Sequence, residues 1–141
     1  MQIPDVNTLV YAHRPEMDHH AAARKWLEHT LTAQEPVLLT DIAISGFLRL
    51  VTNPRVFVEP MTLVDGVQAI EDILARVGVE RGMSGPAHLS LLVDVAPAAV
   101  GDRVPDAYLA ALAVEQDATV VTWDRGIEQF RGVRWMTPGP R

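Results

Sequence analysis

The sequence predicts an α/β fold of three layers, in which a mostly parallel sheet lies between two layers of helices. Three short apolar segments, at residues 1–4, 37–40 and 118–122, have the length and composition of buried strands. Longer segments with apolar residues at helical spacing separate them. Because strands that alternate with helices pair in parallel through crossovers, we expect helices on both faces of the sheet.

The composition indicates one globular domain over residues 1–141 and excludes several classes of protein. Hydrophobic residues make up 48% of the chain, yet no apolar run is long enough for a membrane span, so no membrane contact is expected. The chain has no cysteine, and its first residues do not resemble a signal peptide, so the cytoplasm is the expected compartment. The net charge of −6 excludes a protein that coats nucleic acid through overall basic charge.

In the first half of the chain, helices are predicted on either side of the second strand. A short helix follows the first strand and ends before Arg14-Pro15, since the residue before a proline disfavours helix. Asp18 is predicted to cap the next helix, which runs to about Leu31. After the strand at residues 37–40, an amphipathic helix continues until Asn53-Pro54 stops it.

In the second half, three further helices precede the last predicted strand. Thr62 begins the first of them in a capping-box-like pattern, and its apolar stripe extends up to Gly78. Residues 80–85 are predicted as a loop, after which helices begin at Pro86 and Pro105. The β-branched, apolar segment 118–122 is the clearest strand of the chain.

Three aspartates are predicted to meet at one edge of this sheet. Asp5 and Asp124 follow the first and last predicted strands, and Asp106 lies in the first turn of the helix that begins at Pro105. In parallel sheets of this kind, ligands bind beyond the carboxyl ends of the strands, where the strand order reverses. Each aspartate also has a structural interpretation, because Asp is favoured in the first turn of a helix and in the turn after a strand.

A cluster of three carboxylates indicates a divalent cation. Carboxylates in one cleft repel each other and raise each other's pKa unless a cation compensates them. Hard oxygen ligands without cysteine favour Mg²⁺ or Mn²⁺ over Zn²⁺. Carboxylate-bound Mg²⁺ binds phosphate, which is the arrangement used to hydrolyse phosphodiesters.

Four segments of the chain together resemble the PIN-domain ribonuclease toxins of the VapC family, the toxin half of VapBC toxin-antitoxin pairs. They are residues 3–12 (IPDVNTLVYA), 46–57 (GFLRLVTNPRVF), 105–113 (PDAYLAALA) and 118–125 (ATVVTWDR). The resemblance extends from Ile3 to about Trp135. It implies a three-layer PIN-like fold, with a central, mostly parallel sheet of four to five strands flanked by helices.

The resemblance also implies a function and a site. It implies a metal-dependent endoribonuclease that cleaves cellular RNA with Mg²⁺ or Mn²⁺, is neutralised by a cognate VapB-like antitoxin and forms a homodimer. By position, Asp5 and Asp106 would be metal ligands, and Asp124 would be a further ligand or a water-mediated support. Asn7 and Thr122 would be polar partners of the site, although a helix cap and a buried strand hydroxyl are equally open for them.

The chain departs from the broader PIN pattern at two glycines. Gly46 stands where a helix normally offers a glutamate, and Gly126 stands where a further acid often follows the position of Asp124. This leaves a second interpretation open, a catalytically degenerate PIN module that binds RNA or antitoxin without cleavage. Receiver and haloacid-dehalogenase-like domains are excluded, because both need a lysine near the site and the only lysine is Lys25, in a helix.

Several arginines flank the predicted cleft in sequence and are candidates for contacts with RNA phosphates. They are Arg14, Arg49, Arg55, Arg103 and Arg125. For each of them, solvation or pairing with a carboxylate is the alternative.

Overall fold

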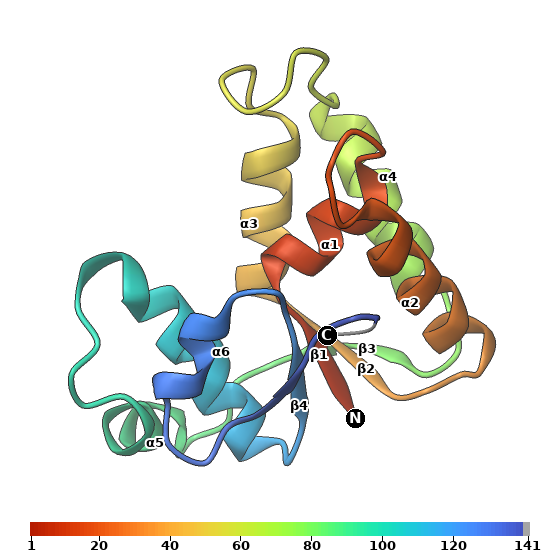
Figure 1. Ribbon diagram of the computed structural model, residues 1–141. Coiled ribbons are helices and arrows are strands. Elements are labelled where there is room, and N and C mark those ends of the chain that lie inside the picture. Colours follow the sequence, from red (N-terminus) through yellow and green to blue (C-terminus); the bar gives the residue numbers. More distant parts are fainter. Residues whose placement is uncertain (140–141) are drawn as a thin grey trace.

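The computed structural model describes residues 1–139 and has a five-stranded sheet between two layers of helices (Figure 1). Every pairing in the sheet is parallel, and the strand order is β3-β2-β1-β4-β5. The strands are β1 (Gln2–Pro4), β2 (Val37–Thr40), β3 (Val79–Gly82), β4 (Thr119–Val121) and β5 (Arg134–Met136). The predicted three-layer α/β fold is confirmed, and the sheet is entirely parallel.

The helices divide between the two faces of the sheet. One layer contains α1 (Val6–His13), α2 (His20–Thr32), α3 (Asp41–Val51) and α4 (Leu63–Leu74). The other contains α5 (His88–Val95) and α6 (Val104–Glu115), which pack against each other. Two short 3₁₀ helices, η1 (Gly101–Arg103) and η2 (Arg125–Gln129), flank the N-terminus of α6 and the end of β4. None of the helices within residues 1–139 is long and apolar enough to cross a bilayer.

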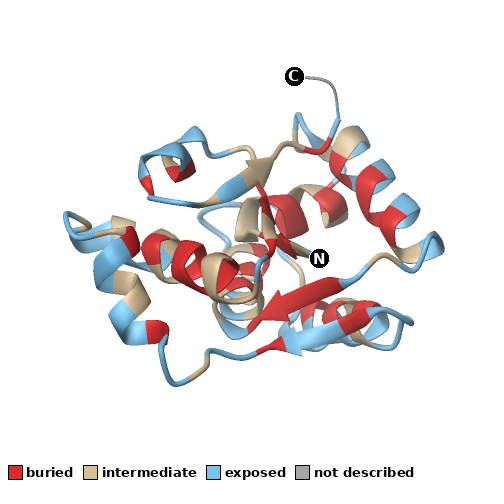
Figure 2. Ribbon diagram, turned by 90° about the horizontal axis from the view of Figure 1, so that it is seen from below, coloured by how far each residue is buried: buried red, intermediate tan, exposed pale blue. Residues whose placement is uncertain are grey.

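Two hydrophobic cores lie on opposite faces of the sheet. In β2, Val37 and Leu39 pack with the helices α1 to α4, whereas Leu38 packs with α6. This division follows from the pleat, since successive side chains of a strand point to opposite faces. Figure 2 shows the buried residues on the strands and on the inward sides of the helices, so both faces of the sheet are covered.

The structure contains two edge strands that were not predicted. Residues 80–85 were predicted as a loop, but Val79–Gly82 pair with β2 as β3. At the other edge, β5 pairs with β4. Both strands carry exposed charged side chains, including Glu80, Arg81 and Arg134, so they lack the apolar run that identifies an inner strand.

The predicted N-terminus of α2 was wrong. Asp18 does not cap this helix, which begins at His20 after the N-cap residue His19 and has no side-chain cap. The turn before it is held instead by the backbone, where the amide of His20 donates to the carbonyl of Met17 at 3.0 Å. The His20 ring also hydrogen-bonds through Nδ1 to the carbonyl of Tyr11 at 2.7 Å, which fixes the start of α2 against α1.

Candidate active site

The candidate site lies where the strand order reverses. From the central strand β1 the chain proceeds to β2 and β3 on one side, and then returns to place β4 and β5 on the other. The amide of Asp5 donates to the carbonyl of Val121 at 3.0 Å, so the chain after β1 lies directly beside the end of β4. Residues that follow these two strands therefore meet at the carboxyl edge of the sheet, as the sequence predicts.

Asp5 is held at this edge by three hydrogen bonds. It is the N-cap residue of α1, and its Oδ1 atom accepts a hydrogen bond from the amide of Val6 at 2.7 Å. Its Oδ2 atom accepts from Thr122 Oγ1 at 2.8 Å and from Asn7 Nδ2 at 2.9 Å. Burial nevertheless raises the pKa of Asp5, and the nearby Asp124 carboxylate adds to this effect, while the bond from Thr122 opposes it.

Thr122 and Asn7 connect Asp5 to the chain after β4. Thr122 is fully buried, and its hydroxyl accepts hydrogen bonds from Asn7 Nδ2 at 2.9 Å and from the amide of Asp124 at 3.0 Å. Asn7 Oδ1 accepts from the amide of Trp123 at 3.3 Å. Because Asp5 is the cap of α1, Asn7 is not a helix cap, whereas Thr122 is a buried hydroxyl as well as a hydrogen-bond partner of Asp5.

Asp106 faces the other two acids from the N-terminal turn of α6. Burial raises its pKa, the carboxylates of Asp5 and Asp124 raise it further, and the Arg103 guanidinium lowers it. Arg103 Nη1 donates to Asp106 Oδ2 at 2.7 Å and to Asp124 Oδ2 at 3.0 Å. A guanidinium therefore bridges two of the three carboxylates.

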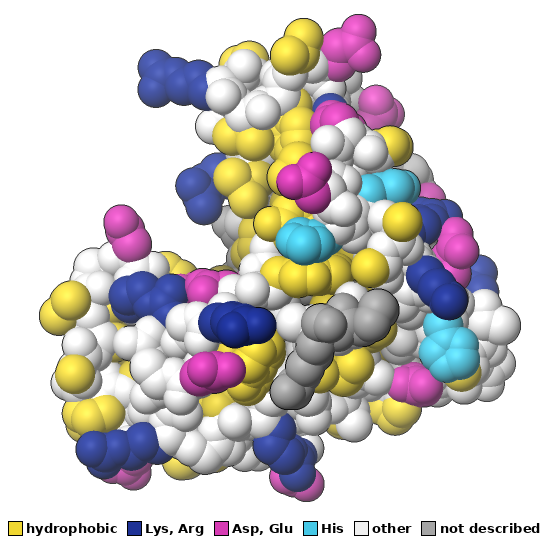
Figure 3. Space-filling model, viewed as in Figure 1, with side chains coloured by type: hydrophobic (Ala, Val, Ile, Leu, Met, Phe, Trp, Pro, Cys, Tyr) yellow, Lys and Arg dark blue, Asp and Glu magenta, His cyan; other side chains and the backbone are white. Residues whose placement is uncertain are grey.

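These side chains line a cleft of about 520 Å³ between α1, α3 and the N-terminus of α6. Its lining residues are Asp5, Val6, Asn7, Ile42, Arg49, Leu50, Asp102, Pro105, Asp106, Leu109 and Asp124. In the space-filling view, a notch separates the lobe of α3 from the lobe of α5 and α6, with basic and acidic side chains side by side along its lower wall (Figure 3).

The donor set of this cleft fits a hard divalent cation. Mg²⁺ is usually bound through one or two carboxylates and completes its octahedron with water and phosphate oxygens. Asp5 and Asp106 face the same cleft, and each has a raised pKa, so added positive charge would stabilise both. In the described part of the chain, however, no three acidic or histidine groups are close enough to hold one ion together.

The two glycines that depart from the PIN pattern are sites of close approach. A Cβ atom at Gly46 would lie 2.5 Å from Val6 Cγ2, so this glycine lets α3 pack against α1. A Cβ atom at Gly126 would lie 2.7 Å from Arg103 Cζ. In this chain, other side chains fill the space that an acid at either position would need.

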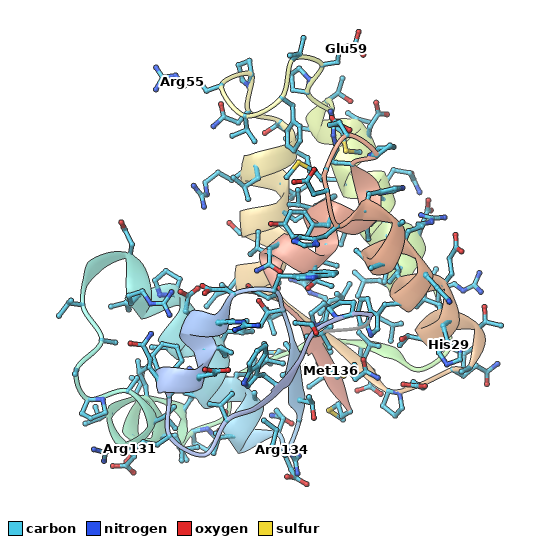
Figure 4. All side chains as sticks on the ribbon, in the orientation of Figure 1. His29, Arg55, Glu59, Arg131, Arg134 and Met136 are labelled. Carbon is cyan, nitrogen blue, oxygen red and sulfur yellow. The ribbon has the colours of Figure 1, made fainter. Side chains whose placement is uncertain are left out.

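Of the five arginines named above, only Arg49 and Arg103 line the cleft or pair with its acids. Arg49 lines it from α3, and Arg103 is paired with its acids. Arg55 projects outward from the tip of the loop between α3 and α4 (Figure 4), and Arg14 pairs with Glu16.

The sequence left two interpretations of Arg103 open, contact with phosphate and pairing with a carboxylate, and the structure shows pairing with Asp106 and Asp124. A signal was available, because residues three apart share a helix face and Arg103 lies three before Asp106.

Comparisons with known proteins agree with this architecture. Residues 3–133 match the model of the PIN domain family. The chain is 42% identical over 136 residues to VapC ribonuclease Mb2897 of Mycobacterium bovis, covering 95% of this chain and 92% of that protein. It is 38% identical over 141 residues to ribonuclease VapC25 of Mycobacterium tuberculosis, covering 98% of this chain and 99% of that protein.

Solved structures show the same fold at low sequence identity. VapBC2 from Rickettsia felis, bound to a DNA fragment from its promoter, matches with a TM-score of 0.68 and 13% identity, over 96% of this chain and 97% of that one. FitAcB from Neisseria gonorrhoeae matches with a TM-score of 0.64 and 21% identity, over 98% of each chain. The chain therefore belongs to the PIN-domain family, and within it to the VapC group.

Proposed function

We propose that the protein is an endoribonuclease toxin that cleaves cellular RNA with the help of Mg²⁺ or Mn²⁺. The observation that carries this proposal is the meeting of Asp5, Asp106 and Asp124 in one cleft at the point where the strand order reverses. The identity to VapC ribonucleases over most of the chain supports RNA as the substrate.

The proposed chemistry divides between a cation and the residues of the chain. A bound divalent cation supplies Lewis-acid stabilisation of phosphodiester charge and makes a coordinated water more acidic. Asp5 and Asp106 would hold that cation, and Asp124 would join them from the end of β4, as a further ligand or through water. Thr122 and Asn7 fix the orientation of Asp5 through the hydrogen bonds to its Oδ2 atom.

The cleft walls suit the binding of an RNA strand. The exposed guanidinium of Arg49 lines the cleft from α3 and is available to a backbone phosphate. Because phosphate contacts position a strand without reading its bases, this arrangement alone does not select a sequence.

We also propose a VapB-like antitoxin as the partner that neutralises the protein. Solved structures with this fold include VapBC and FitAB complexes, which supports such a partner. A basic antitoxin side chain inserted among Asp5, Asp106 and Asp124 would block the proposed cation site. A homodimer and a cytoplasmic location, where cellular RNA is found, complete the proposal.

A second candidate function is RNA or antitoxin binding without cleavage. It is favoured by one observation, the guanidinium of Arg103 between Asp106 and Asp124. The two functions are distinguished by incubating the antitoxin-free protein with total cellular RNA in Mg²⁺, in Mn²⁺ and in EDTA, and by mapping new 5′ ends. Defined new ends in either metal but not in EDTA are expected, and their absence in both metals would favour the binding module.

A further inference from the structure

Arg103 occupies the space between two acids of the cleft. Its Nη1 atom lies 2.7 Å from Asp106 Oδ2 and 3.0 Å from Asp124 Oδ2, so one nitrogen bridges both carboxylates. The arginine is the last residue of η1, and its side chain is 33% exposed, which leaves room for it to move toward solvent. The bridge is thus a contact between the segment before α6 and the segment after β4.

The bridging position is shaped for a guanidinium. Gly126 lies directly against it, and a Cβ atom there would overlap Nη2 and come within 2.7 Å of Cζ. The amide of Gly126 also donates to Asp124 Oδ1 at 2.7 Å, which turns the other oxygen of that carboxylate toward Arg103. The centroid of the Phe130 ring lies 5.8 Å from Arg103 Cζ, so the guanidinium also faces an aromatic ring.

The guanidinium is nevertheless only partly satisfied. Its Nη2 atom is buried and has no hydrogen-bond partner among residues 1–139. A buried donor without a partner is unfavourable, so the bridge is held by charge rather than by a complete hydrogen-bond network. A divalent cation offers the two carboxylates more positive charge than the guanidinium does, and it is therefore able to displace the guanidinium.

The bridge and a shared cation are mutually exclusive on geometric grounds. Mg²⁺ binds its oxygen ligands at about 2.1 Å, so two ligand oxygens of one ion lie no more than about 4.2 Å apart. An ion shared by Asp106 Oδ2 and Asp124 Oδ2 must occupy the volume that Nη1 occupies now. The guanidinium has to leave before the two carboxylates close on an ion.

We propose that Arg103 is an internal counter-ion of the cleft, which neutralises Asp106 and Asp124 in the metal-free protein and competes with the divalent cation for them. This inference rests on the proposed cation site and adds a residue that sets its affinity. In metal-free protein the bridge places a positive charge between the two carboxylates and so relieves their repulsion. Cation binding then includes the work of breaking two charge-assisted hydrogen bonds.

The test is calorimetric titration of the EDTA-treated, dialysed full chain with Mn²⁺. Arg103→Met removes the competing charge and is expected to bind Mn²⁺ about tenfold more tightly than the wild type, since hydrogen bonds to charged groups are worth at least this factor. Arg49→Met is the matched control, because it removes the same charge from the same cleft without breaking an ion pair to the acids. The Mn²⁺ affinity of Arg49→Met is expected to stay within about threefold of the wild-type affinity, because the charge of Arg49 is exposed and screened.

A second variant displaces the guanidinium without changing the charge. Gly126→Ala places a methyl group against the far end of a flexible side chain, so the fold is expected to survive, as circular dichroism would show. It should tighten Mn²⁺ binding in the wild-type background and have no effect in the Arg103→Met background. This variant reports on the same displacement if Arg103→Met does not fold.

The outcomes separate this inference from the proposed function. Equal Mn²⁺ affinity of wild type, Arg103→Met and Gly126→Ala would overturn the counter-ion and leave the cation site standing. Equal tightening by Arg103→Met and Arg49→Met would also overturn it, because general charge would then be the cause. No Mn²⁺ binding by any variant would contradict both proposals.

Discussion

The hydroxyl of Thr122 donates a hydrogen bond to Asp5 Oδ2 at 2.8 Å across 117 positions of sequence. This bond joins the chain after β4 to the chain after β1, at the two strands between which the strand order reverses. Thr122 is completely buried, whereas Asp5 opens onto the cleft, so a core residue orients a cleft residue. The position of the acid thereby depends on the integrity of the sheet.

Thr122→Val should separate this positioning role from simple stability. The variant keeps the shape of the side chain but loses the hydroxyl, so unfolding should become easier by about 1–2 kcal/mol. The Asp5 pKa should rise further, because the hydrogen bond from Thr122 lowers it now. Urea denaturation and an NMR titration of the Asp5 carboxyl measure the two effects.

The control for this variant is Thr8→Val. Thr8 is equally buried and donates to the carbonyl of Val121 at 2.7 Å, but it makes no hydrogen bond to Asp5. It should lose comparable stability and leave the Asp5 pKa unchanged. Equal shifts of that pKa in both variants would contradict the positioning role of Thr122.

Asp106→Asn is expected to change the pH dependence of stability in EDTA. The pKa of Asp106 is raised above 3.8 in the folded protein, so folding favours its protonated form. Between the unfolded and folded pKa values the folded state binds more protons, and stability falls as pH rises through the folded pKa. The variant should therefore be at least as stable as wild type at pH 7, with its advantage shrinking as pH falls toward 3.8.

Urea denaturation across this pH range measures the effect, and Asp41→Asn is the control. Asp41 is exposed, lies outside the cleft and pairs with Arg81. Its loss should give no gain at pH 7, since an exposed pair contributes little. A stability loss at pH 7 in Asp106→Asn that exceeds the loss in Asp41→Asn would contradict the raised pKa of Asp106, to which burial and the neighbouring carboxylates both contribute.

Gly46→Ala should destabilise the contact between α1 and α3. The new Cβ atom would lie 2.5 Å from Val6 Cγ2, and overpacking of this kind costs about 1–3 kcal/mol. Combining it with Val6→Ala removes the obstructing methyl groups, so the double variant should be more stable than the sum of the single effects. Thermal unfolding of the four proteins measures the coupling, and simple additivity would contradict the close packing.

The inner part of the fold could be predicted from the sequence, but its edges could not. β1, β2 and β4 are apolar because both of their faces are covered, and the sequence therefore marks them. β3 and β5 lie at the edges and carry exposed residues such as Glu80 and Arg134. They are strands because they pair with a neighbouring strand, and local composition does not predict that pairing.

The meeting of the three acids could be predicted from the sequence, but the partners of Arg103 could not. Asp5 and Asp124 follow inner strands, and Asp106 begins a helix, so a general rule for parallel sheets places them together. Arg103 bridges Asp106 to Asp124 only because η1 and η2 meet in space and Gly126 leaves room. That contact depends on tertiary packing between separate segments, which local sequence patterns do not predict.

The most direct test of the central claim is RNA cleavage by Asp106→Asn at saturating Mn²⁺, compared with wild type and with Asp41→Asn. The claim is that the carboxylates of the cleft carry the chemistry. If it is right, Asp106→Asn loses about a hundredfold or more in the rate of cleavage, as for removal of a catalytic group, while it stays folded and Asp41→Asn keeps the wild-type rate. A folded Asp106→Asn protein that retains more than about a tenth of the wild-type rate would contradict the account, because a difference that small does not require a catalytic group.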